Sequence, residues 1–293
     1  MADVAPQPAA HGQGILALVG VTLLFGCMDA TAKYLGGRYD PFFVVWARYA
    51  GQAVATLVIF APRLATLART DRPGLQILRS TLLFTATVLF FTGFSLMPLA
   101  EASAIGQLTA LFITALAALV LGERVGPYRW SAVVAGFLGA MLIIQPGTGA
   151  LGWAALLPMA GALAFAAYSI ATRVLGSGEN PWTTFLYTGS VGALAASLAV
   201  PWFWSVPAVA DLPVFALLAA AGALGQALLI FAMRLAPASL LAPFLYLTVV
   251  WAGLNGYLLF DEVPGPATLA GTAVIVGAGL FVHWRESVRG ALR

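Results

Sequence analysis

Ten apolar runs, each long enough to cross a bilayer as a helix, follow one another along almost the whole 293-residue chain. About 20 apolar residues span the roughly 30 Å of hydrocarbon, where only helices or closed barrels pair all their backbone polar groups. The runs lie near residues 14–35, 41–62, 75–96, 100–121, 127–145, 152–174, 182–202, 212–234, 238–260 and 266–284. The pattern predicts an all-α integral membrane protein with ten transmembrane helices.

The composition agrees with a surface that faces lipid. Hydrophobic residues make up 61% of the chain and charged residues 9%, whereas ordinary globular domains carry roughly a quarter charged residues. The bilayer is therefore a predicted partner. The net charge of +3 comes from basic residues spread thinly between the runs. No basic face is formed, so binding to nucleic acid is not predicted.

The boundary features of the first five runs return in the second five. The matched pairs are Lys33–Gly36 with Arg173–Gly176 at an offset of 140, Met97–Ser103 with Met233–Ser239 at 136, and Glu123 with Glu262 at 139. Because five is odd, the second set must enter the membrane from the side opposite to the first. We expect two inverted-topology five-helix repeats, residues 14–145 and 152–284, between a disordered cytoplasmic tail at 1–13 and a cytoplasmic tail at 285–293.

The basic residues predict the orientation, because Lys and Arg favour the cytoplasmic side of short loops. With the N-terminus inside, the inner loops and span ends would hold eleven of the fourteen Lys and Arg. They are Arg63, Arg69, Arg72, Arg79, Arg124, Arg129, Arg173, Arg234, Arg285, Arg289 and Arg293. Both termini are therefore expected in the cytoplasm.

The motifs of the two repeats resemble a known family. Each fourth run opens on Ala-x-Ala-Ser within Leu99–Ser103 or Leu235–Ser239, and each is followed by a glutamate and a glycine-rich fifth run. This pattern is similar to the EamA-type branch of the drug/metabolite transporter superfamily. The departures are Asp261, where the first repeat has Gly122, and Arg234, where it has Pro98.

The resemblance implies a secondary carrier or exporter of small metabolites, often amino acids, in the bacterial inner membrane. Within the branch the chain is similar to amino-acid exporters of the YddG type. Related members carry S-adenosylmethionine, riboflavin or nucleotide sugars.

The chain lacks the residues that an enzymatic or metal-dependent function would need. The chain has no Gly-x4-Gly-Lys-Ser/Thr loop for ATP phosphates, one cysteine (Cys27), and two histidines, one in the tail (His11) and one at a span end (His283). A nucleophile and base pair or a metal site within the bilayer needs more of these groups. We expect no enzyme activity, no cofactor and no metal.

Three ionisable residues lie inside spans near the predicted outer side. Burying a charge in lipid is costly, so such residues are functional candidates. Asp29 and Lys33 are four apart on one helical face, and Arg48 lies at a similar depth. They could bind a zwitterion, with Arg48 or Lys33 on its carboxylate and Asp29 on its amine. Alternatively they form a structural cluster, or Lys33 extends to the surface. Asp29 is also the candidate for coupling to a proton gradient.

A midplane cavity between the repeats would hold the substrate. Gln107 and Gln226 could orient a ligand by hydrogen bonds, and Pro243 could bend its helix as a hinge. The predicted aromatic wall consists of Phe84, Phe91, Tyr168, Tyr246 and Trp251. Each aromatic residue could instead be ordinary core packing. The fifth and tenth spans are expected to pack closely against neighbouring helices through Gly136, Gly139, Gly271, Gly277 and Gly279.

These features predict a transporter that works by alternating access, with amino acids, including aromatic or apolar ones, moved outward. A carrier of S-adenosylmethionine, riboflavin or a cationic drug is the alternative within transport. A membrane scaffold or regulatory subunit without flux is the alternative outside it.

Overall fold

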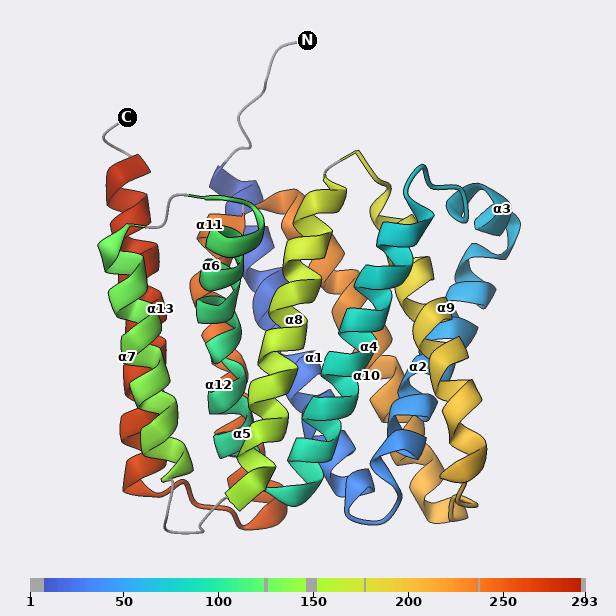
Figure 1. Cartoon of the computed structure of the whole chain (residues 1–293). Helices are drawn as coiled ribbons and strands as arrows, with labels where there is room; N and C mark the ends of the chain where they lie inside the picture. The colour runs from blue at the N-terminus through green and yellow to red at the C-terminus, as the bar shows by residue number, and fades with distance from the viewer. Residues whose placement is uncertain (1–7, 124–125, 146–151, 177, 237, 291–293) are drawn as a thin grey trace.

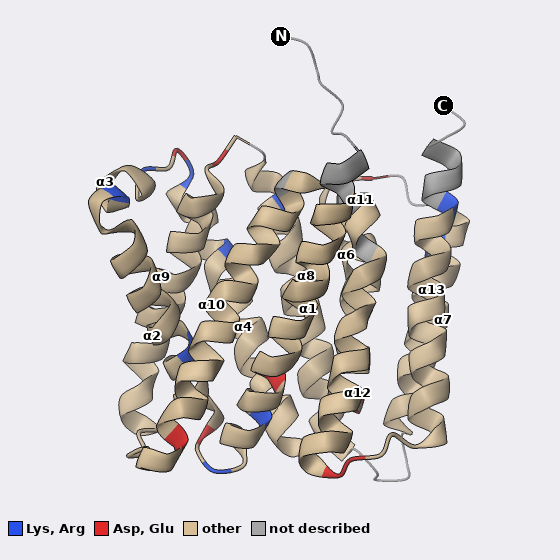
Figure 2. Cartoon of the chain, turned by 180° about the vertical axis from the view of Figure 1, so that it is seen from behind, with Lys and Arg blue, Asp and Glu red and all other residues tan. Residues whose placement is uncertain are grey.

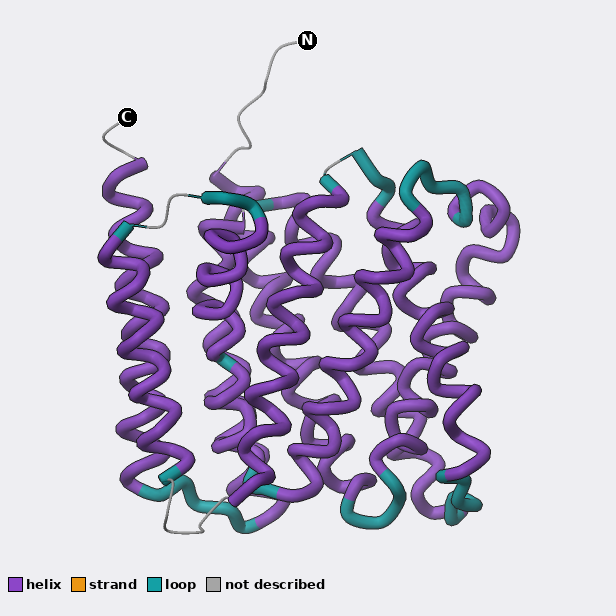
Figure 3. Tube along the Cα trace, in the orientation of Figure 1, coloured by secondary structure: helices purple, strands orange, loops and turns teal. Residues whose placement is uncertain are grey.

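Ten helical segments of the molecule are long and apolar enough to cross a bilayer, as the sequence predicts (Figures 1 and 3). The computed structural model of the chain describes residues 8–123, 126–145, 152–176, 178–236 and 238–290. Within these ranges all regular structure is helical and no strand occurs. The fold is that of an all-α membrane protein.

The first half of the chain forms seven α-helices and one short 3₁₀ segment. They are α1 (Pro8–Gly36), α2 (Pro41–Phe60), η1 (Ala61–Arg63), α3 (Leu64–Leu67), α4 (Pro73–Leu96), α5 (Leu99–Gly106), α6 (Leu108–Val120) and α7 (Pro127–Ile144). The second half forms η2 (Gly152–Ala155), α8 (Leu156–Leu175), α9 (Pro181–Ala199), η3 (Val200–Trp202), η4 (Val209–Asp211), α10 (Leu212–Leu235), α11 (Ala238–Leu241), η5 (Ala242–Tyr246), α12 (Leu247–Phe260) and α13 (Pro266–Gly290).

The two halves have inverted topology. The start of α1 and the end of α13 lie at the same face of the bundle, at the top of Figure 1, which we call the terminal face. The other face is called the opposite face. Helix α1 runs from the terminal face to the opposite face, whereas its counterpart α8 begins at the opposite face. Figure 2 shows most charged residues near these two faces, with broad uncharged bands between them.

Local chemistry starts the second helix of each repeat at equivalent positions. The carboxylate of Asp40 accepts a hydrogen bond from the N–H of Phe42 at 2.8 Å. The side chain of Asn180 likewise accepts from the N–H of Trp182 at 2.9 Å. Both residues are N-caps, and a proline follows each in the first helical turn. Proline has no N–H, but an N–H at this position would have no partner within the helix.

The helix boundaries change one of the sequence matches. Helices α4 and α10 end at Leu96 and Leu235, and α5 and α11 begin at Leu99 and Ala238. Both pairs differ by 139 residues, so the offset of 136 taken from the Ala-x-Ala-Ser letters is wrong by three positions. An alanine-rich segment aligns almost equally well when it is shifted by one helical turn, so its letters can give a wrong offset. The ends of the helices do not have this ambiguity.

The spans also extend further at the chain ends than expected. Helix α1 begins at Pro8, so residues 8–13 are helical rather than part of a disordered tail. Proline suits the first turn of a helix. Helix α13 likewise continues to Gly290, past the predicted end at 284. Outside the described part lie residues 1–7, Arg124 and residues 291–293, and the side chains of Arg234 and Arg289.

The glutamates at the ends of the two fourth spans follow the same backbone turn. Gly122 and Asp261 have φ angles of 67° and 54°, the left-handed region that glycine and, among other residues, aspartate tolerate best. The next N–H, of Glu123 or Glu262, then bonds six residues back, to Ala117 O or Gly256 O, in both repeats. The replacement of glycine by Asp261 therefore leaves the helix end unchanged.

Close contact between glycine backbones joins the fifth and tenth spans at one edge of the bundle (Figure 1). A Cβ added at Gly139 of α7 would lie 2.8 Å from the carbonyl oxygen of Gly271 in α13, and one at Gly271 would lie 2.5 Å from the carbonyl of Gly139. The expected packing of these two spans through glycine is therefore observed.

Candidate functional site

Asp29 on α1 and Arg48 on α2 lie in the same half of the bundle. Each is seven residues from the opposite-face end of its helix, which at 1.5 Å per residue places both at a depth of about 10 Å. Arg48 is near enough for a charge–charge interaction with Asp29. The side chain of Asp29 makes no hydrogen bond or ion pair that the structure describes. The acid and the guanidinium predicted as a zwitterion receptor are thus close together.

Arg48 has unused hydrogen-bond donors although it is 4% exposed. Its guanidinium lies over the ring of Tyr49, 4.4 Å from the centroid. Its Nε and Nη1 donate to no residue in the described part of the chain. A Cβ added at Gly222 of α10 would lie 3.5 Å from Nε, so that glycine leaves room beside the guanidinium. A buried cation with free donors is expensive, and an anionic ligand group would offset that cost.

Gln52 lies one turn after Arg48 on α2 and was missed by the sequence analysis. It is 1% exposed, and neither its amide oxygen nor its amide nitrogen has a described hydrogen-bond partner. Its side chain packs beside Gly189 of α9. The spacing of four residues from Arg48 could have identified it, because residues four apart share one helical face. Together they give α2 a polar inner face.

Lys33 does not join this group. Its Nζ forms an ion pair with Glu262 at 2.8 Å and donates to the carbonyls of Phe94 at 3.1 Å and Met97 at 2.7 Å. Glu262 in turn accepts from the N–H of Leu99 at 2.9 Å. Lys33 therefore has a structural role that the sequence analysis did not predict, because it connects the end of α4 to Glu262.

Both fourth spans are interrupted near midspan. The first breaks at Gln107, between α5 and α6, where the sequence analysis expected a continuous helix. The second forms the 3₁₀ segment η5 around Pro243, the predicted hinge. The amide of Gln107 donates to Thr248 Oγ1 in the first turn of α12 at 2.9 Å. Interrupted helices at the midplane are where transporters of inverted-repeat architecture bind substrates and ions.

Three further predicted residues, Tyr246, Trp251 and Gln226, lie on η5, α12 and α10. The hydroxyl of Tyr246 occupies the space that a Cβ of Gly279 in α13 would fill. Trp251 donates from Nε1 to Thr22 Oγ1 at 3.1 Å, one turn before Asn255, which donates to Gly26 O at 3.0 Å. Gln226 is partly exposed on α10, and its side chain has no hydrogen-bond partner that the structure describes.

Tyr168 lies in the other half of the bundle, with an arginine that the sequence analysis assigned to the inner span ends. Arg79 of α4 is 1% exposed and lies near the terminal-face end of its span, and its assignment to the cytoplasmic side stays a prediction. It donates to Tyr168 Oη and Thr172 Oγ1, both at 2.8 Å, and to Thr188 Oγ1 at 3.2 Å and Thr184 O at 3.4 Å. Its depth of six residues into α4, close to that of Arg48 in α2, was the available signal.

Phe84 and Phe91 are core residues. The Phe84 ring lies 5.6 Å from that of Tyr49, and Phe91 is 2% exposed within the main hydrophobic cluster. Of the predicted aromatic wall, Tyr168, Tyr246 and Trp251 contact polar groups or helix breaks. Phe91 is packed in the core and Phe84 is partly buried against it, and their place in a substrate wall stays a prediction.

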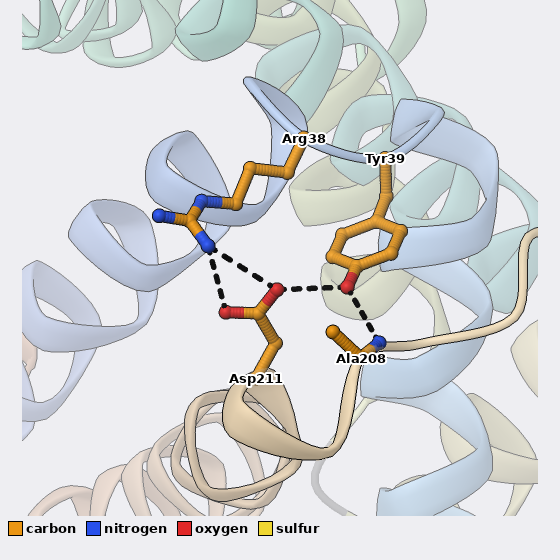
Figure 4. A network of polar contacts seen from close by, with 4 residues as sticks. All are labelled: Arg38, Tyr39, Ala208 and Asp211. Carbon is orange, nitrogen blue, oxygen red and sulfur yellow. Dashed lines mark hydrogen bonds and ion pairs between the residues drawn. The ribbon is translucent and has the colours of Figure 1, made fainter.

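A separate polar network joins the repeats at the opposite face (Figure 4). Asp211 is buried and accepts from Arg38 at 3.1 Å and from the hydroxyl of Tyr39 at 2.7 Å. The N–H of Ala208 donates to that hydroxyl at 2.9 Å, which lowers the pKa of Tyr39. Its hydrogen bond to Asp211, desolvation and the Asp211 charge outweigh this and raise the pKa above its ordinary value. The network closes the loops of this face.

Among the described residues, no three His, Cys, Asp or Glu side chains lie close enough together to hold a metal ion. The groups available for binding are the guanidinium, carboxylate and amide groups of α1, α2 and the midplane breaks.

Comparison with known proteins places this geometry in a family of membrane carriers. The EamA-like transporter family matches residues 12–145 and 152–284. A riboflavin transporter of Rhizobium johnstonii is 32% identical over 98% of this chain and 96% of its own length. An S-adenosylmethionine uptake transporter of Rickettsia bellii is 28% identical over 88% of this chain and 89% of its own.

A pseudopaline exporter of Pseudomonas aeruginosa is 28% identical over 90% of this chain and 94% of its own length. A solved crystal structure covers 92% of this chain and 95% of that one, with a TM-score of 0.64 at 20% identity. That likeness shows the shared fold.

Proposed function

This chain belongs to the EamA-like transporter family of the drug/metabolite transporter superfamily, and from that premise we propose that it carries small zwitterionic metabolites, foremost amino acids. It is a multi-pass membrane transporter of small molecules and not an enzyme. The proposal concerns the substrate, its direction of movement and the site.

The observation that carries the proposal is the pair of Asp29 and Arg48. Arg48 has free donors for a carboxylate, and guanidinium–carboxylate pairs are favourable in geometry and strength. Asp29 offers an acceptor for an ammonium group in the same half of the bundle. Gln52, Gln107 and Gln226 would contact polar parts of the substrate. A core made mostly of apolar and aromatic side chains supports amino acids with aromatic or apolar side chains.

We place the terminal face in the cytoplasm of a bacterial inner membrane, with amino acids moved outward by alternating access. The basic residues of this face, among them Arg63, Arg69 and Arg72 between α2 and α4, support that orientation. Pro243 would act as a hinge where the second broken span bends. Asp29 would couple transport to a proton gradient.

Riboflavin is the second candidate, favoured by the transporter of that name that matches 98% of this chain. The flavin ring is neutral and would use the amides and aromatic residues rather than Arg48. S-Adenosylmethionine, which the Rickettsia relatives take up, carries an amino-acid head group and would use Asp29 and Arg48 as amino acids do.

The test is uptake of labelled phenylalanine, leucine, S-adenosylmethionine and riboflavin into liposomes that contain only this protein, with and without a pH gradient. We expect saturable amino-acid flux and at least a 100-fold higher half-saturation concentration in Arg48→Gln. Arg63→Gln, at an exposed arginine of the terminal face, is the matched control and should transport normally.

If riboflavin is transported and the Arg48→Gln variant transports it equally well, riboflavin would replace amino acids as the proposed substrate. The absence of flux for every compound in a folded protein would reject the zwitterion proposal and favour a scaffold role.

A further inference from the structure

Two ion pairs occupy equivalent positions in the inverted repeats. At the opposite face Lys33 of α1 pairs with Glu262, just after α12, at 2.8 Å. At the terminal face Arg173 of α8 pairs with Glu123, just after α6, at 2.5 Å. Lys33 and Arg173 are 140 residues apart and the glutamates 139 apart, the same offsets that relate the helices of the two repeats. Each pair therefore joins the first span of one repeat to the fourth span of the other.

The two pairs differ in burial. The side chains of Lys33 and Glu262 are 12% and 22% exposed, whereas those of Arg173 and Glu123 are 57% and 31% exposed. Exposed ion pairs are weakened by water and salt far more than buried ones. The opposite face is therefore held more firmly than the terminal face.

The buried pair also fastens two more helix ends. Lys33 donates to the last carbonyls of α4, at Phe94 and Met97, where the helix dipole favours a cation. Glu262 accepts from Leu99 N at the start of α5, where the dipole favours an anion. In the described part of the chain, Arg173 and Glu123 make no such contacts with α10 or α11. Breaking the Lys33–Glu262 pair would free four helix ends at once.

We propose that the two ion pairs are the alternating gates of the transport cycle. Lys33–Glu262 closes the opposite face while the terminal face opens by separation of Glu123–Arg173, and the reverse holds in the other half of the cycle. These four residues position helices and do not bind the substrate. The proposal rests on transport by alternating access in the function proposed above, but not on the identity of the substrate.

Spin-label distances at equivalent sites test the gates without any substrate. In a Cys27→Ser background, one sample carries labels at Tyr34→Cys and Leu259→Cys, beside the opposite-face pair. A second carries labels at Val174→Cys and Val120→Cys, beside the terminal-face pair. All four positions are exposed and are related by the repeat offsets. Distance distributions are recorded in lipid nanodiscs.

Removing either cation should shift the two faces in opposite directions. Lys33→Met is expected to raise the long-distance population at Tyr34–Leu259 at least fivefold and to lower it at Val174–Val120. Arg173→Met should do the reverse. Lys33→Arg, which keeps the cation, is the matched control and should resemble the parent protein. Shifts in the same direction, or none in folded protein, would overturn the proposal.

A charge exchange at the exposed pair provides a second test, since it does not disturb the buried contacts. Arg173→Glu should open the terminal face, and Glu123→Arg combined with Arg173→Glu should close it again. Failure of the double variant to restore the parent distances would reject the pairing as a gate. If the spin-label distances change as expected but amino acids do not cross the liposome membrane, the gate proposal is supported and the proposed substrate is rejected.

Discussion

Arg48 and Arg79 are two buried guanidinium groups at similar depths below opposite faces of the bundle. Arg79 makes four hydrogen bonds, to Thr172, Thr184, Thr188 and Tyr168. Arg48 has two nitrogens without a described partner and contacts an aromatic ring. Sequence position does not separate them, because each lies six or seven residues into a span. The hydrogen bonds that their side chains make do distinguish the two arginines.

The difference assigns the two residues different tasks. A buried polar group costs little when its hydrogen bonds are made and several kcal/mol when they are not. Arg79 joins α4 to α8 and α9 with its donors used, as expected of a structural group. Arg48 retains donors without a protein partner in the described part of the chain, which a ligand would satisfy. The contrast leads to the following predictions, in order of decreasing effect.

Replacing Arg48 by methionine should give the largest effect, on binding alone. The affinity for labelled phenylalanine is expected to fall about 100-fold, which corresponds to roughly 2.7 kcal/mol. Thermal stability in detergent should stay the same or rise, because an apolar side chain replaces a buried, partly unpaired cation. Scintillation proximity binding and thermal unfolding measure the two quantities. A variant that loses stability in step with affinity would contradict the distinction between the arginines.

Replacing Arg79 by methionine should affect stability instead. Loss of its charged hydrogen bonds is expected to lower the free energy of unfolding by about 2 kcal/mol. Arg79→Lys, which keeps the charge with fewer donors, should lose less. Folded Arg79→Met protein, isolated at low temperature, should bind substrate within about threefold of the parent, which is below 0.7 kcal/mol. Unchanged stability with lost binding would instead make Arg79 a ligand-binding residue.

The sequence predicted the features that depend on neighbouring residues. Ten spans and the inverted repeat follow from apolar length and from matched residues at the span boundaries. The 3₁₀ segment around Pro243 follows from a proline inside a span, and its role as a hinge stays a prediction. The equivalent break at Gln107 was missed, although the preceding Gly106 is a helix breaker that could have indicated it.

The features that were missed depend on which side of a helix meets a neighbour. Lys33 and Glu262 lie 229 residues apart, and their pairing needs the inverted packing of both repeats. The hydrogen bonds of Arg79 were missed because its distance from the span end does not reveal the acceptors at Thr172 and Thr188. The sequence around Gln52 does not mark it as a site residue. Only its position on the same helical face as Arg48 could have identified it.

Replacing Asp29 by asparagine sharpens the comparison by testing the other half of the proposed receptor. The amide keeps the shape but loses the charge, so the affinity for zwitterionic phenylalanine should fall about tenfold, or 1.4 kcal/mol. The affinity for its analogue without the amino group, phenylpropionate, should change less than threefold. Uptake driven by a pH gradient should also be lost. Equal losses for both ligands would remove Asp29 from the amine-binding role.

Two glutamines show the same contrast between a side chain with a hydrogen-bond partner and one without a described partner. The expected changes in unfolding free energy are smaller than for the arginines. Gln107 donates to Thr248, so Thr248→Val should cost about 1 kcal/mol of unfolding free energy. Gln52 has both amide atoms unpaired, so Gln52→Leu should gain up to about 1 kcal/mol, because an uncompensated polar group leaves the interior. Thermal unfolding in detergent measures both changes. Equal destabilisation by the two variants would mean that Gln52 is hydrogen-bonded in the folded protein, and unpaired groups would then no longer distinguish the site around Arg48.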